Sequence, residues 1–206
     1  GGARVVKVEA VSRPDGGRAD RSGFFDLLHH GQESVALDLP STYGLAQLRR
    51  LLAAADVVIE GSRPRALRQW GIDAEAFLAA ESGPRVWVSL TGHGRDGDAG
   101  VRIAFGDDAA VAAGLVVGDA DGPVFLADAI ADPLTGIAAH RAVTEALRGG
   151  GRWLLDAALA RVAASVAGDP SPGRTVDDAT PPSARPVPGA APGLGADTDA
   201  VLAGLR

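Results

Sequence analysis

Four short apolar segments stand out along the chain, at residues 5–8, 35–39, 57–59 and 86–90. They are rich in Val and Ile and almost continuous, which is typical of strands whose two faces are both covered. Helical patterns separate them: one over residues 41–55, capped by Ser41, and two shorter ones over residues 64–71 and 73–80. Strands that alternate with helices predict an α/β fold, with a Rossmann-like parallel sheet flanked by helices.

The second half of the chain continues this pattern less regularly. We expect loops at residues 10–33 and 92–100, a helix at 107–117, and a longer helix from Asp132-Pro133 to Leu147. Residues 152–167 predict a strand that turns into a helix. Residues 1–168 are therefore interpreted as the core domain, residues 169–190 as a Pro/Gly-rich linker, and residues 191–206 as a C-terminal segment that closes with a short helix.

Composition narrows the possible functions. The 206-residue chain carries a net charge of -6, which argues against nonspecific nucleic-acid binding. It contains no run of 18 apolar residues, so no membrane span is expected. Cysteine is absent, which excludes disulfides and Cys-ligated zinc and suits a cytoplasmic protein. The four histidines lack metal-ligand spacing, so no metal site is predicted.

A glycine-rich motif follows the fourth predicted strand. Residues 92–97 match the pattern G-x-G-x-x-G, which binds a dinucleotide pyrophosphate when a helix opens directly after it. Here two aspartates and another glycine follow or interrupt the motif, and acidic side chains repel a pyrophosphate. We favour a plain loop over a nucleotide site.

Asp132 is the strongest candidate for a catalytic residue. Because Pro133 follows it, Asp132 is predicted to be an N-cap, whose carboxylate accepts backbone N–H bonds. The same position suits a nucleophile, since the helix dipole and the N–H groups would keep the carboxylate ionised at neutral pH. Such a group can attack an activated acyl carbon. The two interpretations are compatible.

Several segments together resemble family III CoA-transferases, the carnitine/bile-acid group that includes formyl-CoA transferases and α-methylacyl-CoA racemases. Each segment is weakly specific, but their order and spacing follow the family. The matching segments are residues 2–9 (GARVVKVE), 34–39 (SVALDL), 55–60 (ADVVIE) with Arg63-Pro64, 85–94 (RVWVSLTGHG), 132–136 (DPLTG) and 191–199 (APGLGADTD). Relative to full-length members, the first strand and a small inserted domain are expected to be missing.

The resemblance implies a specific reaction for Asp132. In the transferase branch, an Asp four residues before a Gly attacks the thioester of an acyl-CoA, and Gly136 stands at the matching distance. CoA then passes through an aspartyl thioester to an acceptor carboxylic acid. Acyl-CoA and the acid are substrates, and no permanently bound cofactor is implied. Because family members form interlocked dimers, we expect a homodimer or a heteromer with a complementary chain.

Other positions match family residues that contact CoA. Leu37, Gly61 and Ser62 match residues on the adenine and ribose side. Gln69 and Trp70 match a pair that flanks the nucleotide, and Arg102 matches a residue that meets phosphate. The chain departs from the family where basic residues usually stand, and the replacing residues are Ala10, Pro40 and Gln69.

Two alternative functions stay open at this point. The first is an α-methylacyl-CoA racemase-like isomerase, which pairs the Asp with a His as two bases. Phe105 occupies the position of that His, so His93 or His140 would have to replace it. The second is a non-catalytic CoA-binding or partner subunit of a split enzyme.

Overall fold

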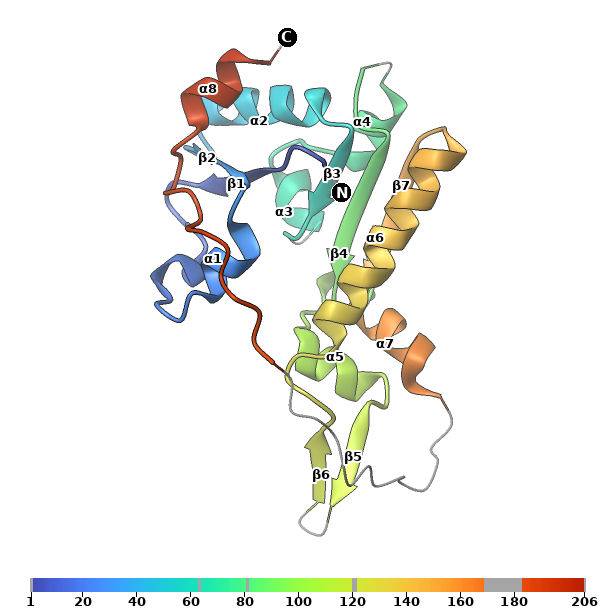
Figure 1. The fold of residues 1–206 in the computed structure, drawn as a ribbon. Coiled ribbons are helices and arrows are strands. Elements are labelled where there is room, and N and C mark those ends of the chain that lie inside the picture. The colour runs from blue at the N-terminus through green and yellow to red at the C-terminus, as the bar shows by residue number, and fades with distance from the viewer. Residues whose placement is uncertain (1, 63, 81, 120–121, 169–182, 206) are drawn as a thin grey trace. The chain divides into compact units, whose positions relative to one another are not determined.

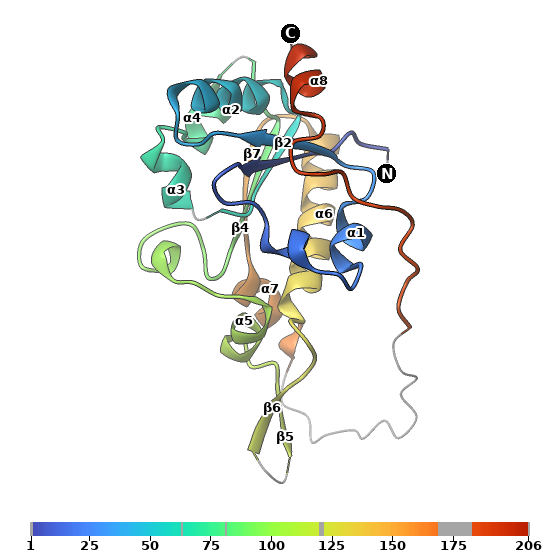
Figure 2. The same cartoon turned by 90° about the vertical axis from the view of Figure 1, so that its left-hand side faces the viewer.

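The computed structural model describes residues 2–62, 64–80, 82–119, 122–168 and 183–205 (Figures 1 and 2). The chain divides into two compact units. Unit 1 comprises residues 1–51 with 173–206, and unit 2 comprises residues 52–172. Unit 1 is thus built from both ends of the chain. Among the described residues, no helix combines the length and apolar character needed to cross a bilayer.

The parallel pair β1 (Val6–Ala10) and β2 (Glu33–Leu37) is the centre of unit 1. Between these strands lie a 3₁₀ turn, η1 (Gly16–Ala19), and the short helix α1 (Phe24–His29). After β2 comes α2 (Thr42–Ala54), and Ser41 caps it as predicted because its Oγ accepts the Gly44 N–H at 3.0 Å. The C-terminal helix α8 (Thr198–Ala203) lies against β2.

A partly buried ion pair holds unit 1 together. Arg18 donates to the Glu9 carboxylate at 2.5 Å, to Ser34 Oγ at 3.1 Å and to the Pro192 carbonyl at 2.9 Å. Its guanidinium also lies 4.9 Å from the centre of the Phe25 ring. Glu9 is buried, and the charged, hydrogen-bonded Arg18 offsets the hydration that its carboxylate loses. The pKa of Glu9 accordingly lies below its ordinary value, chiefly because of the Arg18 hydrogen bond.

Unit 2 is organised around β4 (Val86–Thr91), which pairs in parallel with both β3 (Val57–Glu60) and β7 (Trp153–Ala158). Alternate β4 side chains pack on opposite faces. Val86 and Val88 pack with Ala146 of the long helix α6 (Ala131–Gly149), which runs beside β4 and β7 (Figure 1). Trp87 points the other way, towards Phe77 of α4 (Ala74–Ala79). Both faces of β4 are therefore covered, as its apolar sequence predicts.

A second cluster of unit 2 brings three helices together. α5 (Gly106–Ala112) packs against α6 and against α7 (Leu159–Ala167), which follows β7 directly. Small buried residues allow this close approach, namely Ala109, Ala110, Ala131 and Ala163. The first turn of α6 thereby comes next to the first turn of α5, and this contact builds the candidate site described below.

The predicted α/β class with parallel strands flanked by helices is confirmed, as is each predicted strand, with shifts of one or two residues at its ends. The strand that turns into a helix at residues 152–167 is also confirmed.

Two local predictions were wrong. The helix expected at residues 107–117 ends at Ala112, and residues 116–119 form β5 (Val116–Asp119), antiparallel to β6 (Gly122–Phe125). Gly114 has a φ of +86°, which ends the helix, and the following Val pair favours a strand. The loop expected at residues 10–33 contains η1 and α1, because Asp15 caps η1 through the Gly17 N–H and Phe25 is buried.

The predicted linker is only partly visible. Residues 169–182 lie outside the described residues. Residues 183–190 are exposed and contain neither helix nor strand. The remaining elements are α3 (Pro64–Gln69), in unit 2, and the 3₁₀ turn η2 (Ala99–Val101) within the 92–100 loop.

Candidate active site

Asp132 lies in the first turn of α6, two residues after the N-cap position. The helix begins at Ala131, and Ile130 occupies the N-cap position without a side-chain hydrogen bond. The prediction that Asp132 caps its own helix is therefore wrong. The Asp132 N–H already donates to the Ala129 carbonyl at 2.9 Å, while Ala131 is fully buried and draws the helix start into the core. The Asp132 carboxylate is left exposed.

The carboxylate instead faces the start of α5. The backbone N–H of Gly106, the first residue of that helix, donates a hydrogen bond to Asp132. The fit is tight, because a Cβ placed on Gly106 would lie 2.6 Å from Asp132 Oδ2 and 2.5 Å from the Ala129 carbonyl oxygen. Only glycine at position 106 lets the two helix starts approach this closely.

Two further carboxylates belong to the same junction. Asp107 Oδ1 accepts the Ala129 N–H at 2.7 Å, and Asp108 Oδ1 accepts the Phe105 N–H at 2.5 Å. Ala129 has a φ of +46°, a left-handed conformation that costs a non-glycine residue on the order of 1 kcal/mol or more. The Asp107 hydrogen bond helps to hold it there.

This environment raises the pKa of Asp132 above its ordinary value. Partial burial of the carboxylate is the largest cause, the nearby charges of Asp107 and Asp108 add to it, and the Gly106 hydrogen bond opposes it. The expectation that a helix start would favour the ionised form is therefore corrected. The Gly106 N–H favours the ionised form, but the loss of hydration and the nearby negative charges outweigh its effect.

The residues considered for racemase chemistry offer no second base beside this carboxylate. Phe105, which immediately precedes α5, is 75% exposed and has no titratable group. His140 is exposed on α6, eight positions after Asp132, and His93 lies in the loop after β4. Among the described residues, no group of three or more His, Cys, Asp and Glu side chains could hold a metal ion.

Five of the six residues expected to contact CoA lie in unit 2. Gly61 and Ser62 are exposed just after β3, and Gln69 and Trp70 are at the end of α3. Arg102 follows η2 with an exposed side chain that makes no salt bridge to any described residue.

Leu37 belongs to unit 1, at the end of β2. Its side chain is 3% exposed, so it could shape a ligand site only through its backbone or by supporting its neighbours.

The glycine-rich loop after β4 is occupied by internal contacts. The Arg95 N–H donates to Asp156 Oδ2 at 3.1 Å, and Thr91 Oγ1 donates to Asp156 Oδ1 at 2.9 Å. The motif continues into η2 rather than opening a long helix. This geometry agrees with a plain loop.

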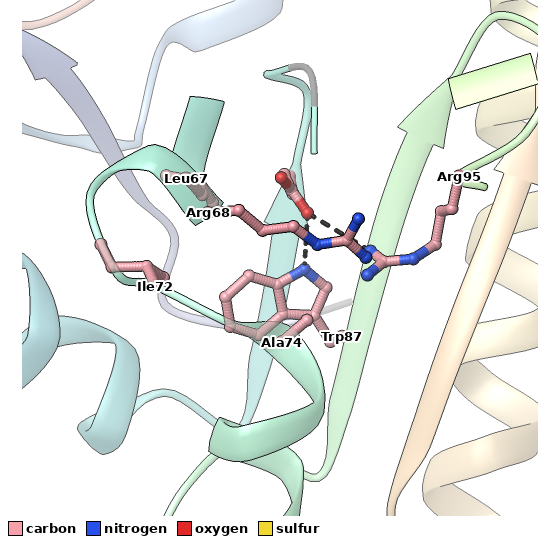
Figure 3. A pocket seen from close by; sticks show the side chains of 7 residues that line it. Leu67, Arg68, Ile72, Ala74, Trp87 and Arg95 are labelled. Carbon is pink, nitrogen blue, oxygen red and sulfur yellow. Dashed lines mark hydrogen bonds and ion pairs between the residues drawn. The ribbon is translucent and has the colours of Figure 1, made fainter. Parts of the chain in front are cut away.

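A buried polar cluster fixes the end of β3, and its side chains line a small pocket (Figure 3). Glu60 Oε2 accepts from Trp87 Nε1 at 2.9 Å and from Ser89 Oγ at 3.0 Å. Arg95 pairs with Glu60 at 3.6 Å and with Glu75 at 3.1 Å. Figure 3 shows the labelled side chains of Arg95 and Trp87, and its dashed lines mark interactions within this cluster. Its members satisfy one another, so the cluster is a support for the residues that follow β3.

Gly106, Asp107 and Asp108 were not predicted as site residues. They lie more than 20 positions from Asp132 in the sequence, and acidic residues in the first turn of a helix ordinarily serve only its dipole. The glycine at the very start of an Ala-rich helix was the one local signal that another backbone comes close.

The chain is similar in sequence to proteins named as CoA-transferases. The chain is 30% identical to a succinate–glutarate CoA-transferase of Agrobacterium fabrum, over 80% of this chain and 46% of that protein. It is 26% identical to a succinyl-CoA–D-citramalate CoA-transferase of Chloroflexus aurantiacus, over 75% of this chain and 42% of that protein. The chain thus spans less than half the length of these relatives.

The fold is similar to that of solved proteins. The crystal structure of a CAIB/BAIF family protein from Brucella suis superposes with a TM-score of 0.72 at 28% identity, covering 82% of this chain and 49% of that one. The family model described as CoA-transferase family III matches residues 1–194. Because that match includes nearly the whole chain, the protein belongs to CoA-transferase family III.

Proposed function

We propose that the protein transfers CoA between an acyl-CoA and a carboxylic acid, with Asp132 as the nucleophile. The observation that carries this proposal is the Asp132 carboxylate itself. It is exposed at the start of α6, it is oriented by the Gly106 N–H, and it belongs to the Asp-Pro-Leu-Thr-Gly segment that resembles the family's nucleophile motif. Its relatives named as CoA-transferases support the same reaction class.

In the first half-reaction, an Asp132 oxygen attacks the thioester carbonyl carbon. The C–S bond breaks, CoA leaves as a thiolate, and a mixed anhydride joins Asp132 to the donor acyl group. The thiolate then attacks the Asp132 carbonyl carbon and expels the donor carboxylate, which leaves an aspartyl-CoA thioester.

The second half-reaction reverses these steps with the acceptor. The acceptor carboxylate attacks the aspartyl thioester and CoA leaves, and the thiolate then attacks the acceptor's acyl carbon. Acceptor acyl-CoA forms and the Asp132 carboxylate is regenerated. One thioester replaces another, so neither ATP nor a resident cofactor is required.

The junction of α5 and α6 suits this role. A carboxylate with a raised pKa is more basic, and its ionised form is therefore a stronger nucleophile. We propose that the Gly106 N–H orients the carboxylate for attack. A group positioned in this way loses little freedom on reaching the transition state.

We propose that CoA is bound by the residues that match the family's contacts. Exposed Arg102 would meet a phosphate, and Trp70 with Gln69 would flank the nucleotide. Gly61 and Ser62 would line the adenine and ribose side. Leu37, in unit 1, is proposed for the same side because it matches a family residue there. The Glu60–Arg95 cluster would keep Gly61 and Ser62 in place, because Glu60 directly precedes them.

We further propose that the protein works in the cytoplasm, as a homodimer or with a complementary chain. Analytical ultracentrifugation of the purified protein would distinguish a monomer from either assembly. Because several relatives are named for succinate or glutarate, succinyl-CoA and glutarate are the first donor and acceptor to test.

The test is to trap the activated Asp132 carboxyl group, which is present in both the mixed anhydride and the aspartyl-CoA thioester. The protein is incubated with succinyl-CoA and hydroxylamine, digested and analysed by mass spectrometry. We expect a hydroxamate on Asp132. Asp132→Asn should abolish trapping and transfer to glutarate while CoA affinity, measured by calorimetry, stays nearly unchanged. Asp128→Asn, in the exposed loop before α6, is the matched control and should behave as the native protein.

Each other outcome has a distinct meaning. A fully active Asp132→Asn protein would end the nucleophile assignment. Deuterium incorporation at the α-carbon without acyl exchange would indicate racemase chemistry. No heat on mixing with CoA would argue that this chain is a partner subunit that needs a second chain.

A further inference from the structure

Asp107 acts on the residues around Asp132 through the backbone. Its Oδ1 accepts the Ala129 N–H at 2.7 Å, across 22 positions of sequence. Ala129 in turn adopts a left-handed conformation, and its carbonyl oxygen accepts the Asp132 N–H at 2.9 Å. A short chain of contacts therefore runs from the Asp107 side chain through one strained residue to the backbone of Asp132.

The junction leaves little room for adjustment. The Ala129 carbonyl oxygen and Asp132 Oδ2 both lie within 2.6 Å of the position that a Gly106 Cβ would occupy. Ala129 cannot relax towards an ordinary conformation without moving its carbonyl, and the start of α6 would move with it. The Asp107 hydrogen bond is the side-chain contact that holds the Ala129 N–H.

We propose that Asp107 is a positioning residue for the Asp132 nucleophile: it fixes the left-handed turn at Ala129 and places a second negative charge beside the reacting carboxylate. This inference rests on the proposed function. No part of it requires Asp107 to touch the substrate.

The charged groups that act on Asp132 are both acidic and both on α5, namely Asp107 and Asp108. Of the two, Asp107 has the larger effect in raising the Asp132 pKa. Removing its charge should lower the pKa of Asp132, so that the carboxylate stays ionised, and able to attack, at lower pH.

Two variants separate the hydrogen bond from the charge. Asp107→Asn keeps an oxygen that can accept the Ala129 N–H but removes the charge. Asp107→Ala removes both. Asp128→Asn is the control. It removes one negative charge from the loop that contains Ala129, and Asp128 is not among the groups that shift the pKa of Asp132.

Two measurements are made on each protein. The first is the Asp132 side-chain carbonyl resonance, followed by NMR as a function of pH without ligand. The second is the pH profile of hydroxylamine trapping with succinyl-CoA. We expect both midpoints to move to lower pH in Asp107→Asn and to stay in place in Asp128→Asn. Asp107→Ala should trap about 10- to 100-fold more slowly than Asp107→Asn at pH 8, with little change in the KM for succinyl-CoA.

The proposal is overturned if Asp107→Asn titrates like Asp128→Asn, or if Asp107→Ala traps as fast as Asp107→Asn. These results are distinct from failure of the proposed function. If the native protein traps no acyl group at any pH, the transferase proposal fails, whereas the NMR titration still decides whether Asp107 controls Asp132. Should Asp107→Ala not fold, Asp107→Asn alone tests the charge.

Discussion

At the scale of single residues, the candidate site depends on a carboxylate placed where the fold disfavours its charge. Asp132 loses part of its hydration and faces two other carboxylates, with one backbone N–H in compensation. A structural carboxylate of this kind would ordinarily be paired with a cation, as Glu9 is with Arg18. Asp132 forms no ion pair with any described residue, and an acid without a cationic partner at an exposed helix start is typical of a functional group.

This placement predicts a stability effect that depends on pH. Because the pKa of Asp132 is higher in the folded protein than its ordinary value of 3.8, its ionised form destabilises the folded state at neutral pH. The penalty fades as the pH falls through the raised pKa and is absent below about 3.8. Asp132→Asn should therefore be more stable than the native protein at pH 7, and the difference should vanish in acid.

Urea unfolding at several pH values measures this effect. Asp132 is exposed, so solvent screening keeps the gain small, and the direction is the decisive quantity. A loss of stability at pH 7 would show that the carboxylate serves as a structural cap after all.

At the scale of elements, β4 and the loop after it hold unit 2 together. β4 hydrogen-bonds to a strand on each side, and its polar residues carry the buried cluster that joins the end of β3 to α4. Both Glu60 and Arg95 are 5% exposed, so neither charge is solvated by bulk water. Removing Arg95 leaves the Glu60 carboxylate buried without its counter-ion.

Arg95→Met should lower the free energy of unfolding by about 3–5 kcal/mol, which is typical when one partner of a buried pair is removed. The double variant with Glu60→Gln should recover part of this loss, because no charge then remains buried. Chemical unfolding followed by tryptophan fluorescence measures both. If Arg95→Met costs less than 1 kcal/mol, water reaches Glu60 and the cluster is not a rigid support.

At the scale of the whole molecule, the two ends of the chain meet in unit 1. Asp197 Oδ2 accepts the Ser34 N–H at 2.8 Å, and Thr198 Oγ1 accepts the Ala36 N–H at 3.0 Å. These bonds satisfy the β2 edge that β1 does not cover, with partners more than 160 positions away in the sequence. The C-terminal segment is thus a part of the β1–β2 unit.

Single substitutions can test whether the C-terminal segment stays bound to β2. Thr198→Val should speed hydrogen exchange at the Ala36 amide, and Asp197→Ala should do so at the Ser34 amide, because each loses its acceptor. The Val88 amide in β4 of unit 2 is an internal reference. Unchanged exchange at both β2 amides would mean that the C-terminal segment does not stay docked in solution.

The sequence alone determined the parallel strands, the long helix and the α/β class, since these follow from local apolar patterns that the core then buries. It also marked Asp132, whose Asp-Pro pair and spacing to Gly136 are local features. Only the tertiary structure decided how that carboxylate is held. Gly106 and Asp107 come close to Ala129 and Asp132 because the starts of α5 and α6 pack together. No local pattern encodes a contact between two segments so far apart in the sequence. For the same reason the direction of the Asp132 pKa shift could not be foreseen: hydration and neighbouring charges depend on what the fold brings near.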